Sequence, residues 1–436
     1  MAISNELNSS IAKRLSKRRL FYVCRDVERA FVSGLSLGNY YIITNSNTYS
    51  AKLAKTNNNI ILIKNKQPLD TAELLEHPET KRLIQPKDLV VVFKNNAIVK
   101  NICQKNKWQL LNPDFKLADE IESKISQIKW LGKLTKYLPP HKVGLCQNIN
   151  WGGEKFILQF NHSHTGTGTF LINSKKQLVE LKNKFPNREV RTMKFINGPV
   201  LTNNNVVWGE KTLIGNINYQ ITGLSPFTDN KFTTIGNDWA LPIRLLNRKQ
   251  AQSYKKIIIN IGTKMAKDGW KGLFGVDMIM DEKSGQLYLL EINARQPASA
   301  TFESQLQHNV IPSELAYASD EESIPKKQDR DPSPRKGFGM TKLTTTFEAH
   351  LASLLNMPNK NYKLISIDKG AQIIQRVTKN ISNPKFNLKN KSILNVINYK
   401  NKTIGSDLIR IQCQEGLMAK HNVLNKLGKN IRDSIC

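Results

Sequence analysis

The chain has 436 residues, 39% of them hydrophobic, which is enough for about two to four structural units with apolar cores. It has 65 lysine and arginine residues against 35 aspartate and glutamate residues, and the resulting formal charge of +30 favours anionic ligands such as nucleotides. The lysines are dispersed, and the sequence has neither zinc-ligand spacing nor an aromatic RNA-binding signature. Nucleic acid therefore stays an alternative partner that the sequence does not favour.

The cysteines and the N-terminal sequence indicate the compartment. The five cysteines are odd in number and scattered, unlike those of a disulfide framework. Residues 1–18 lack the apolar core of a signal peptide, and no apolar run approaches the ~20 residues that cross a bilayer. We therefore expect a cytoplasmic protein without a membrane partner, and we expect residues 1–18 to be a disordered N-terminus.

Residues 19–115 alternate short β-branched runs with polar or helical spacers. Four of these runs have the composition of strands: LFYVC at 20–24, YYIITNS at 40–46, NIILIKN at 59–65 and DLVVVFK at 88–94. Three of them have no polar alternation, which is typical of strands that are buried on both faces of a parallel sheet. The pattern predicts a small parallel α/β domain.

Residues 116–319 form a second region, which mixes helices and strands. Apolar residues recur at helical spacing over 119–134, so one helix is expected there. The strand FILQF at 156–160 leads into a loop that contains Gly166 and Gly168. Such glycines let the backbone approach a ligand closely, and consecutive N–H groups in these turns bind anions, although an ordinary hairpin turn has the same composition.

Residues 274–281 and 287–295 flank the polar turn EKSG and are typical of an antiparallel hairpin. One register of this hairpin places Asp277 directly opposite Glu291, with their Cβ atoms about 5 Å apart. Two carboxylates at that distance repel each other unless a cation lies between them. The hairpin therefore predicts a cation site.

The period of a strand predicts which residues accompany Glu291. Alternate residues share one face, which here carries Leu287, Leu289, Glu291, Asn293 and Arg295. Carboxylate and amide oxygens suit Mg²⁺, and a guanidinium can pair with an anion. The alternative is a strand that simply ends in solvent with polar residues.

The C-terminal part begins after a charged, proline-rich segment at 320–337, which predicts a loop or linker. Beyond it, residues 344–357 are expected to be helical and residues 370–378 to be a strand. His350 and Arg376 in these elements are candidates for substrate contacts, but core or surface roles are favoured for both.

Together these residues resemble the ATP-grasp superfamily, whose fold is shared by biotin carboxylase, D-alanine–D-alanine ligase and related carboxylate–amine ligases. The resemblance covers roughly residues 20–380, and its most specific part is FGVDMIMDEKSGQLYLLEINARQPAS. It implies an α/β (α+β) ATP-grasp fold with a parallel pre-ATP-grasp domain at 19–115. The core at 116–319 would have two subdomains with a hinge near 192–198, and residues 338–436 would be its C-terminal part and an extension.

The same resemblance implies roles for individual residues. ATP with Mg²⁺ or Mn²⁺ would be held by Asp277, Glu291 and Asn293, and Arg295 would be the catalytic residue that faces the γ-phosphate or the carboxylate substrate. The implied ATP-binding residues are Lys124 and Gln159 at the phosphates, Gly166 and Gly168 in the loop over them, Lys194 and Ile196 at adenine, and Gln220 near ribose or substrate.

Two positions depart from the family's pattern. Gln159 stands where the strand before the glycine loop usually carries a lysine, and an amide can donate a hydrogen bond to phosphate but supplies no charge. Met193 and Lys194 stand in the hinge, where an acid is usual. Either change would weaken nucleotide binding or mark a subgroup.

The resemblance implies an ATP- and Mg²⁺-dependent ligase. A small carboxylate would attack the γ-phosphate to give an acyl phosphate, and an amine or similar nucleophile would then displace phosphate. Two alternatives stay open: a biotin-carboxylase-like enzyme that activates bicarbonate, which the N-x-R motif favours, and a degenerate scaffold that binds polyanions, which the charge and Gln159 favour. A homodimer is compatible with the family by analogy.

Overall fold

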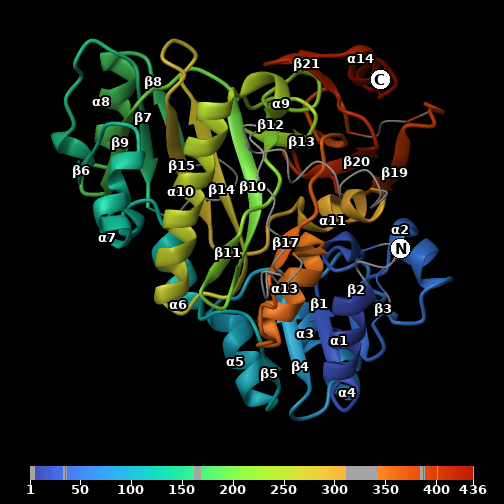
Figure 1. The fold of residues 1–436 in the computed structure, drawn as a ribbon. Helices are drawn as coiled ribbons and strands as arrows, with labels where there is room; N and C mark the ends of the chain where they lie inside the picture. The colour runs from blue at the N-terminus through green and yellow to red at the C-terminus, as the bar shows by residue number, and fades with distance from the viewer. Residues whose placement is uncertain are drawn as a thin grey trace, which may run out of the picture.

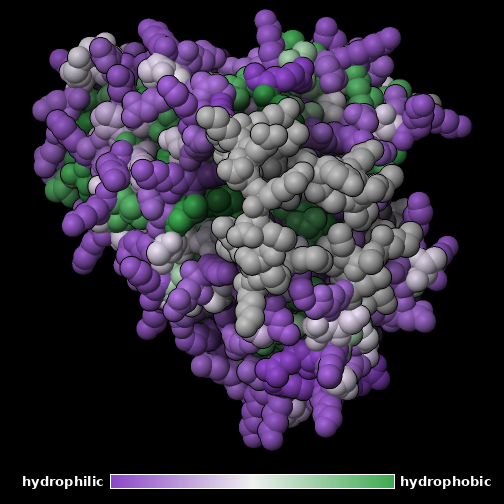
Figure 2. Space-filling view, in the orientation of Figure 1, coloured by the Kyte–Doolittle hydropathy of each residue, from purple (hydrophilic) through white to green (hydrophobic). Residues whose placement is uncertain are grey.

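The computed structural model describes residues 5–32, 35, 37–161, 168–310, 341–382, 386, 388–399 and 401–435. Figure 1 shows a parallel sheet with its helices, a large antiparallel sheet in the middle and a small sheet to one side. In Figure 2, which has the same orientation, the residues coloured by hydropathy are mainly hydrophilic. Within the described ranges no helix is long and apolar enough to cross a membrane.

The N-terminal body is a five-stranded parallel sheet with the order β3-β2-β1-β4-β5. Its strands are β1 (Leu20–Val23), β2 (Tyr40–Asn45), β3 (Ile60–Ile63), β4 (Leu89–Val92) and β5 (Gln109–Leu110). The helical elements around it are η1 (Val27–Arg29), α2 (Thr48–Ala54), α3 (Thr71–Glu76), α4 (Pro78–Leu83) and α5 (Ala97–Lys105). The parallel sheet and its four predicted strands are confirmed.

Both faces of this sheet are buried, as the unbroken apolar runs predicted. Phe21 and Val90 belong to one core, with residues of α3 and α5. Tyr22 and Val91 belong to the other core, with residues of α1 (Asn5–Leu15) and α13 (Thr346–Leu354).

Helix α1 shows that the expectation of disorder over residues 1–18 is wrong for the part that the structure describes. Leu7, Ile11 and Leu15 are at most 2% exposed and share a core with β1. Their spacing of four residues puts them on one face of the helix. The sequence did not predict this helix because its apolar face is only a narrow stripe among many polar residues.

The central body is an antiparallel sheet with the order β15-β14-β10-β12-β13-β18-β20-β19, in which β11 pairs with β10. Its strands are β10 (Val200–Trp208), β11 (Lys211–Leu213), β12 (Asn218–Thr222), β13 (Thr234–Asp238), β14 (Gly272–Met280), β15 (Leu287–Asn293), β18 (Ala371–Arg376), β19 (Ile393–Asn398) and β20 (Asp407–Cys413). Helix α10 (Arg248–Lys267) covers one face, where Ile257, Ile261 and Met265 pack with apolar residues of β14 and β15.

A row of hydrogen-bonded side chains crosses the central sheet from β20 to β12. Arg410 donates to Oε1 of Gln372 at 3.3 Å, and Nε2 of Gln372 donates to Oδ1 of Asn237 at 2.8 Å. Nδ2 of Asn237 then donates to Oδ1 of Asn218 at 2.8 Å. All four side chains are buried. Burial in this row is tolerated because each of the three amide oxygens accepts a hydrogen bond, and the nitrogens of Gln372 and Asn237 each donate to the next member.

The small sheet has the order β6-β9-β7-β8 and lies beside the β15 edge of the central sheet (Figure 1). Its elements are β6 (His141–Leu145), η3 (Cys146–Asn148), β7 (Phe156–Phe160), β8 (Thr169–Ile172), α8 (Lys175–Lys184) and β9 (Glu189–Lys194). Leu178 and Leu181 of α8 pack against Leu158 and Val190, so the helix covers one face of the sheet. The other face carries Gln159 and is turned toward the central sheet.

The helix expected over residues 119–134 is broken in the structure, which corrects that prediction. Helix α6 (Phe115–Glu122) is separated from α7 (Ser126–Leu131) by a short break. In the break, the backbone N–H groups of Lys124 and Ile125 donate to Asn161, beside the small sheet, at 3.1 and 2.9 Å. This tertiary contact overrides the helical periodicity and places Lys124 at the turn.

The remaining elements are η2 (Gly132–Tyr137), α9 (Pro242–Leu245), α11 (Ala300–His308), β16 (Lys342–Thr344), β17 (Tyr362–Leu364), β21 (Met418–Lys420), β22 (Val423–Leu424) and α14 (Lys426–Asp433). The helix predicted at 344–357 and the strand predicted at 370–378 are confirmed by α13 and β18. The predicted linker at 320–337 lies outside the described residues, and the domain limits 19–115, 116–319 and 338–436 stay predictions.

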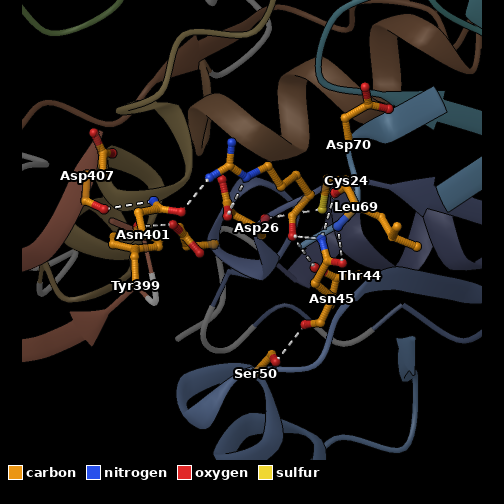
Figure 3. Close-up of polar contacts among 12 residues, drawn as sticks. Cys24, Asp26, Thr44, Asn45, Ser50, Leu69, Asp70, Tyr399, Asn401 and Asp407 are labelled. Atoms are coloured by element: carbon orange, nitrogen blue, oxygen red, sulfur yellow. Dashed lines mark hydrogen bonds and ion pairs between the residues drawn. The ribbon is translucent and has the colours of Figure 1, made fainter. Parts of the chain in front are cut away.

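The loop after β1 meets the C-terminal strands at the carboxyl edge of the parallel sheet (Figure 3). The Arg25 guanidinium donates to Oδ1 of Asn401 at 3.4 Å, and Nδ2 of Asn401 donates to the Asp407 carbonyl at 2.8 Å. The Arg25 carbonyl accepts from the side chains of Thr44 and Asn45, at 3.2 and 2.9 Å. These bonds join the end of β2 to the central sheet through one arginine.

His350 of α13 is a core residue, as its favoured role predicted. It is 4% exposed, and its Nδ1 accepts a hydrogen bond from the backbone N–H of Leu273 at 3.0 Å. Burial lowers the pKa of His350 to about 3, so the ring is neutral in the folded protein at neutral pH. Gly272 gives the ring its space, because its φ is +81° and a Cβ there would lie 2.6 Å from Nδ1.

This buried neutral histidine predicts a loss of stability in acid. Below the unfolded-state pKa of ~6.5 the unfolded chain binds a proton at His350 that the folded protein does not, so the free energy of unfolding falls. Between pH 7 and pH 5 this single group accounts for about 2 kcal/mol. Urea unfolding of His350→Asn, which keeps an acceptor for Leu273, is expected to show a smaller difference between the two pH values. An equal difference in both proteins would contradict this origin.

Candidate functional site

A cleft of about 600 Å³ lies between the small sheet and the central sheet. The small sheet contributes residues of β7, β8 and β9, and the central sheet contributes residues of β10, β12, β13, β14 and β15. The central-sheet wall is largely polar, and its polar lining residues include Thr202, Gln220, Asn237, Asp277, Glu291 and Asn293. The cleft has the size and the few converging polar groups of a small-molecule site.

Most of the site residues expected from the sequence meet in this cleft. Those that line it are Lys124, Gln159, Lys194, Ile196, Gln220, Asp277, Glu291, Asn293 and Arg295. Gly168 lies just before β8, where its carbonyl accepts from the Phe160 N–H at 3.0 Å. Gly166 lies outside the described residues. The structure thus brings together side chains that are far apart in the sequence, and their roles stay predictions.

The hairpin register is as predicted, but the strand alternation is not. Asp277 pairs with Glu291, whereas Met278 pairs with Leu289, so Leu290 is an extra residue in β15. This β-bulge reverses the alternation. Leu287 and Leu289 face the core under α10, and Leu290 lines the cleft with Glu291. The prediction that Leu287 and Leu289 share the face of Glu291 is therefore wrong.

Neighbouring side chains stabilise the negative charge of both Asp277 and Glu291. Thr202 Oγ1 donates to Asp277 Oδ1 at 2.6 Å, and Asn293 Nδ2 donates to Oδ2 at 3.3 Å. Lys124 Nζ lies 2.8 Å from Oε2 of Glu291, and the Lys124 side chain is 6% exposed. The helix break at Lys124 thus delivers a buried cation to the bulged strand.

The two carboxyl groups respond differently to these surroundings. Burial raises the pKa of Asp277, and the charge of Glu291 raises it further. Burial also acts to raise the pKa of Glu291, but the charge and hydrogen bond of Lys124 outweigh it, so that pKa is lowered. Glu291 is therefore ionised at neutral pH, and Asp277 is the group whose charge still lacks compensation.

These residues fit Mg²⁺ better than a transition metal. Two carboxylates and an amide offer hard oxygen ligands, and Mg²⁺ uses few protein ligands because water and phosphate complete its octahedron. Among the described residues no cluster of three or more His, Cys, Asp and Glu side chains could hold a metal. The uncompensated Asp277 carboxyl beside Glu291 is where an added cation would lower the electrostatic free energy.

Arg295 lines the cleft next to this pair. It forms an ion pair with Glu122 at the end of α6, and Glu122 also accepts from Lys94 Nζ at 2.6 Å. Burial acts to lower the pKa of Arg295, but Glu122 and Glu291 outweigh it, so the pKa is raised. Arg295 is thus a fixed cation at the end of the hairpin.

Residues 193–198, within the predicted hinge, form part of the cleft wall. The N–H of Lys194 donates to the Pro140 carbonyl at 2.8 Å, so the part of the Lys194 peptide that a ligand can use is its carbonyl. Gly198 follows with φ +154°, and a Cβ there would lie 1.9 Å from the Met280 carbonyl oxygen. The segment between β9 and β10 can therefore lie against the end of β14 only because residue 198 is glycine.

Sequence reasoning missed the C-terminal hairpin of β21 and β22, whose turn residues His421 and Asn422 line the cleft. The Tyr219 hydroxyl lies 2.9 Å from Nδ1 of His421, donates to Oδ1 of Asn422 at 3.1 Å and accepts from the Asn422 N–H at 3.2 Å. Nε2 of His421 lies 3.7 Å from Glu282 in the β14–β15 turn. No motif marks this turn in the sequence, because only the tertiary fold brings it to the cleft.

Sequence reasoning also missed Arg191 on β9, which is fully buried beside Gln159. Its Nε and one terminal nitrogen donate to Oε1 of Gln159 at 3.1 and 2.7 Å, and its other terminal nitrogen donates to Oε1 of Gln127 at 3.2 Å. The available signal was an arginine inside a strand sequence, VRTMKF.

Arg376 is held by structural contacts although it reaches the cleft wall. Its guanidinium donates to Asp407 Oδ1 at 2.8 Å and to the carbonyls of Gly405 and Thr234, both at 2.9 Å. These bonds fix it as a brace between β18 and β20, in keeping with the structural role that the sequence favoured.

Solved structures with this architecture were found by comparison, whereas no family model and no curated protein matches the sequence. N5-carboxyaminoimidazole synthetase from Staphylococcus aureus, in complex with ADP, superposes with a TM-score of 0.58 at 11% identity over 96% of this chain and 97% of that one. The biotin carboxylase domain of Hydrogenobacter thermophilus 2-oxoglutarate carboxylase, with MgADP and bicarbonate, gives 0.60 at 11% identity over 91% and 86%.

A third neighbour is the L-amino acid ligase from Bacillus licheniformis, with a TM-score of 0.55 at 11% identity over 96% of this chain and 97% of that one. These are ATP-grasp structures, and the match spans nearly the whole of each chain. The predicted α/β ATP-grasp fold is thereby confirmed.

Loss of the Tyr219 hydroxyl is expected to loosen the C-terminal hairpin. Tyr219→Phe keeps the ring but loses the three hydrogen bonds to His421 and Asn422. If the net loss of stability is that of one or two hydrogen bonds, at about 1 kcal/mol each, amide exchange should rise roughly 5- to 30-fold. Hydrogen–deuterium exchange over residues 418–424 measures this. Tyr288→Phe on the same sheet is the control, since within the described part of the chain its hydroxyl has no hydrogen-bond partner. Unchanged exchange in Tyr219→Phe would show that the hairpin is held otherwise.

Proposed function

We propose that this chain, which has the ATP-grasp fold, is an ATP- and Mg²⁺-dependent ligase that activates a small carboxylate as an acyl phosphate for attack by an amine. The observation that carries the proposal is the opposed pair Asp277 and Glu291 in the cleft, flanked by the buried Lys124 and the half-buried Arg295. This arrangement is suited to a triphosphate that brings its own divalent cation.

In this proposal ATP lies along the cleft. The Lys194 carbonyl and the Ile196 backbone meet the adenine at the hinge, with the His421–Asn422 turn over the same end. Asp277, Glu291 and Asn293 hold Mg²⁺, which neutralises phosphate charge when it is bound. Gln159 and Lys124 face the phosphates, and Gly168 lies just before β8 on the small-sheet side. Gly166 lies outside the described residues and stays a predicted contact.

The chemistry then needs positioning and charge more than covalent participation by the protein. A carboxylate oxygen of the substrate attacks the γ-phosphorus, the bond to the β–γ bridging oxygen breaks, and ADP leaves. The amine attacks the acyl carbon, phosphate leaves, and the amine gives up a proton. Lys124 and Arg295 stabilise the negative charge that builds up on the transferred phosphoryl group.

Bicarbonate is the second candidate for the activated carboxylate. Asn293 and Arg295 stand at alternate positions after Glu291 and both line the cleft. The neighbour from Hydrogenobacter thermophilus was solved with bicarbonate. Both candidates share the first chemical step, the attack of a carboxyl oxygen on the γ-phosphate, so they differ only in the acid that enters.

Removal of the Glu291 charge is expected to abolish turnover without unfolding the protein. Glu291→Gln keeps the shape of the side chain, but Lys124 loses its ion pair and Mg²⁺ loses one of its two carboxylate ligands. ADP release should therefore fall by about 100-fold or more. Circular dichroism is expected to be unchanged. Glu180→Gln on the exposed face of α8 is the charge-matched control and should turn over normally. Normal ADP release by Glu291→Gln would refute the assignment of the site.

The two candidate acids are separated by ADP release in buffer purged of carbon dioxide. The ligase proposal predicts that some small carboxylate, together with an amine, stimulates ADP release in purged buffer, because no bicarbonate is then needed. Stimulation that appears only when bicarbonate is added would select the second candidate. A protein that neither releases ADP with any acid nor binds Mg-ATP in calorimetry would rule out both and favour a scaffold that binds polyanions.

A further inference from the structure

Arg191 is a buried cation without a carboxylate partner in the described part of the chain. Its side chain has no solvent exposure, and its hydrogen bonds go to the amide oxygens of Gln159 and Gln127. A buried guanidinium that is compensated only by neutral amides is costly, because the protein replaces water without supplying an opposite charge. The binding of an anionic ligand nearby would offset this cost.

The guanidinium lies within electrostatic range of the phosphate end of the cleft. Burial lowers the pKa of Arg191 to about 10, and the negative charge of Glu291 opposes this shift. The side chain is therefore protonated at neutral pH, and its charge acts on Glu291. Glu291 itself is already paired with Lys124 at 2.8 Å, so it does not neutralise Arg191 as well.

Arg191 also fixes which way the Gln159 amide points. Two guanidinium N–H groups converge on Oε1 of Gln159, so this atom must be the oxygen and the NH₂ group must lie on the other side. That NH₂ group donates to Oγ1 of Thr169 at 3.2 Å, and both Gln159 and Thr169 line the cleft. The amide therefore presents a donor to the cleft, polarised by the cation behind it.

We propose that Arg191 is a positioning residue for the nucleotide phosphates, and that the pair Arg191–Gln159 supplies from inside the small sheet the positive charge that a lysine at 159 would supply directly. The amide makes the contact with a phosphate oxygen, and the guanidinium provides the charge and the orientation. This inference rests on the proposed function, because it needs a nucleotide in the cleft. It explains how a neutral residue at 159 is compatible with a triphosphate ligand.

The test is the dependence of affinity on the number of phosphates. Calorimetric titrations with AMP, Mg-ADP and Mg-ATP are made on the natural protein and on Arg191→Met, which has similar length but neither charge nor donors. Loss of a charge-assisted contact to phosphate should weaken Mg-ATP binding about 10- to 100-fold. AMP binding should stay nearly unchanged, since its adenosine is held at the hinge. A purely structural role for Arg191 would weaken all three nucleotides together.

A second variant keeps the test informative if Arg191→Met unfolds. In the double variant Arg191→Met with Gln159→Lys, the lysine ammonium enters the cleft directly, and Mg-ATP affinity should recover by at least tenfold relative to Arg191→Met. Where Arg191→Met does not fold, Mg-ATP affinity is compared between Gln159→Lys and Arg191→Lys. Arg191→Lys retains the charge but lacks the forked guanidinium that orients the Gln159 amide, so it should bind Mg-ATP more weakly than Gln159→Lys.

Arg188→Met is the matched control, because Arg188 is exposed, precedes β9 and is removed from the cleft. It changes the net charge equally and should leave all three affinities as they are. Equal Mg-ATP and AMP effects in Arg191→Met, or no recovery in the double variant, would overturn the inference. If the natural protein binds no Mg-ATP, the proposed function fails instead.

Discussion

The repulsion between Asp277 and Glu291 is the constraint around which the cleft is arranged. The hairpin register forces the two carboxylates to face each other, and three different elements then supply compensation: Thr202 from β10, Asn293 from β15 and Lys124 from the helix break. Without these partners the pair would destabilise the hairpin at neutral pH. Lys124 balances only one of the two charges, so the pair still needs a further cation to be balanced fully, at the wall of a cleft of ligand size.

Two local irregularities make this arrangement. The bulge at Leu290 lets β15 keep Leu287 and Leu289 in the core while it turns Glu291 and Asn293 to the cleft. The break after α6 swings Lys124 toward Glu291 and attaches it to the small sheet through Asn161. A regular strand and a regular helix would each have pointed these side chains elsewhere, so the irregularities are part of the site and not defects of the fold.

Sequence patterns predicted most of the fold because the strands of the N-terminal sheet and the long amphipathic α10 carry strong periodicity. They also predicted the register of the hairpin, since two acids inside apolar strands are conspicuous. They could not predict the bulge or the helix break, which depend on tertiary contacts. Nor could they find Arg191 or the His421–Asn422 turn, because a lone arginine in a strand and a short polar turn carry no periodic signal.

The amide row of the central sheet has a direction that its separate hydrogen bonds do not reveal. Each member passes a donor to the next, from the Arg410 guanidinium through Gln372 and Asn237 to Asn218, whose own NH₂ is buried without a partner in the described part of the chain. An amide that rotated alone would set donor against donor, and a reversal of the whole row would turn the Gln372 NH₂ toward the Arg410 guanidinium, which has no acceptor. The row therefore has one fixed direction, in which the N–H groups point from β20 toward β12, a strand that lines the cleft.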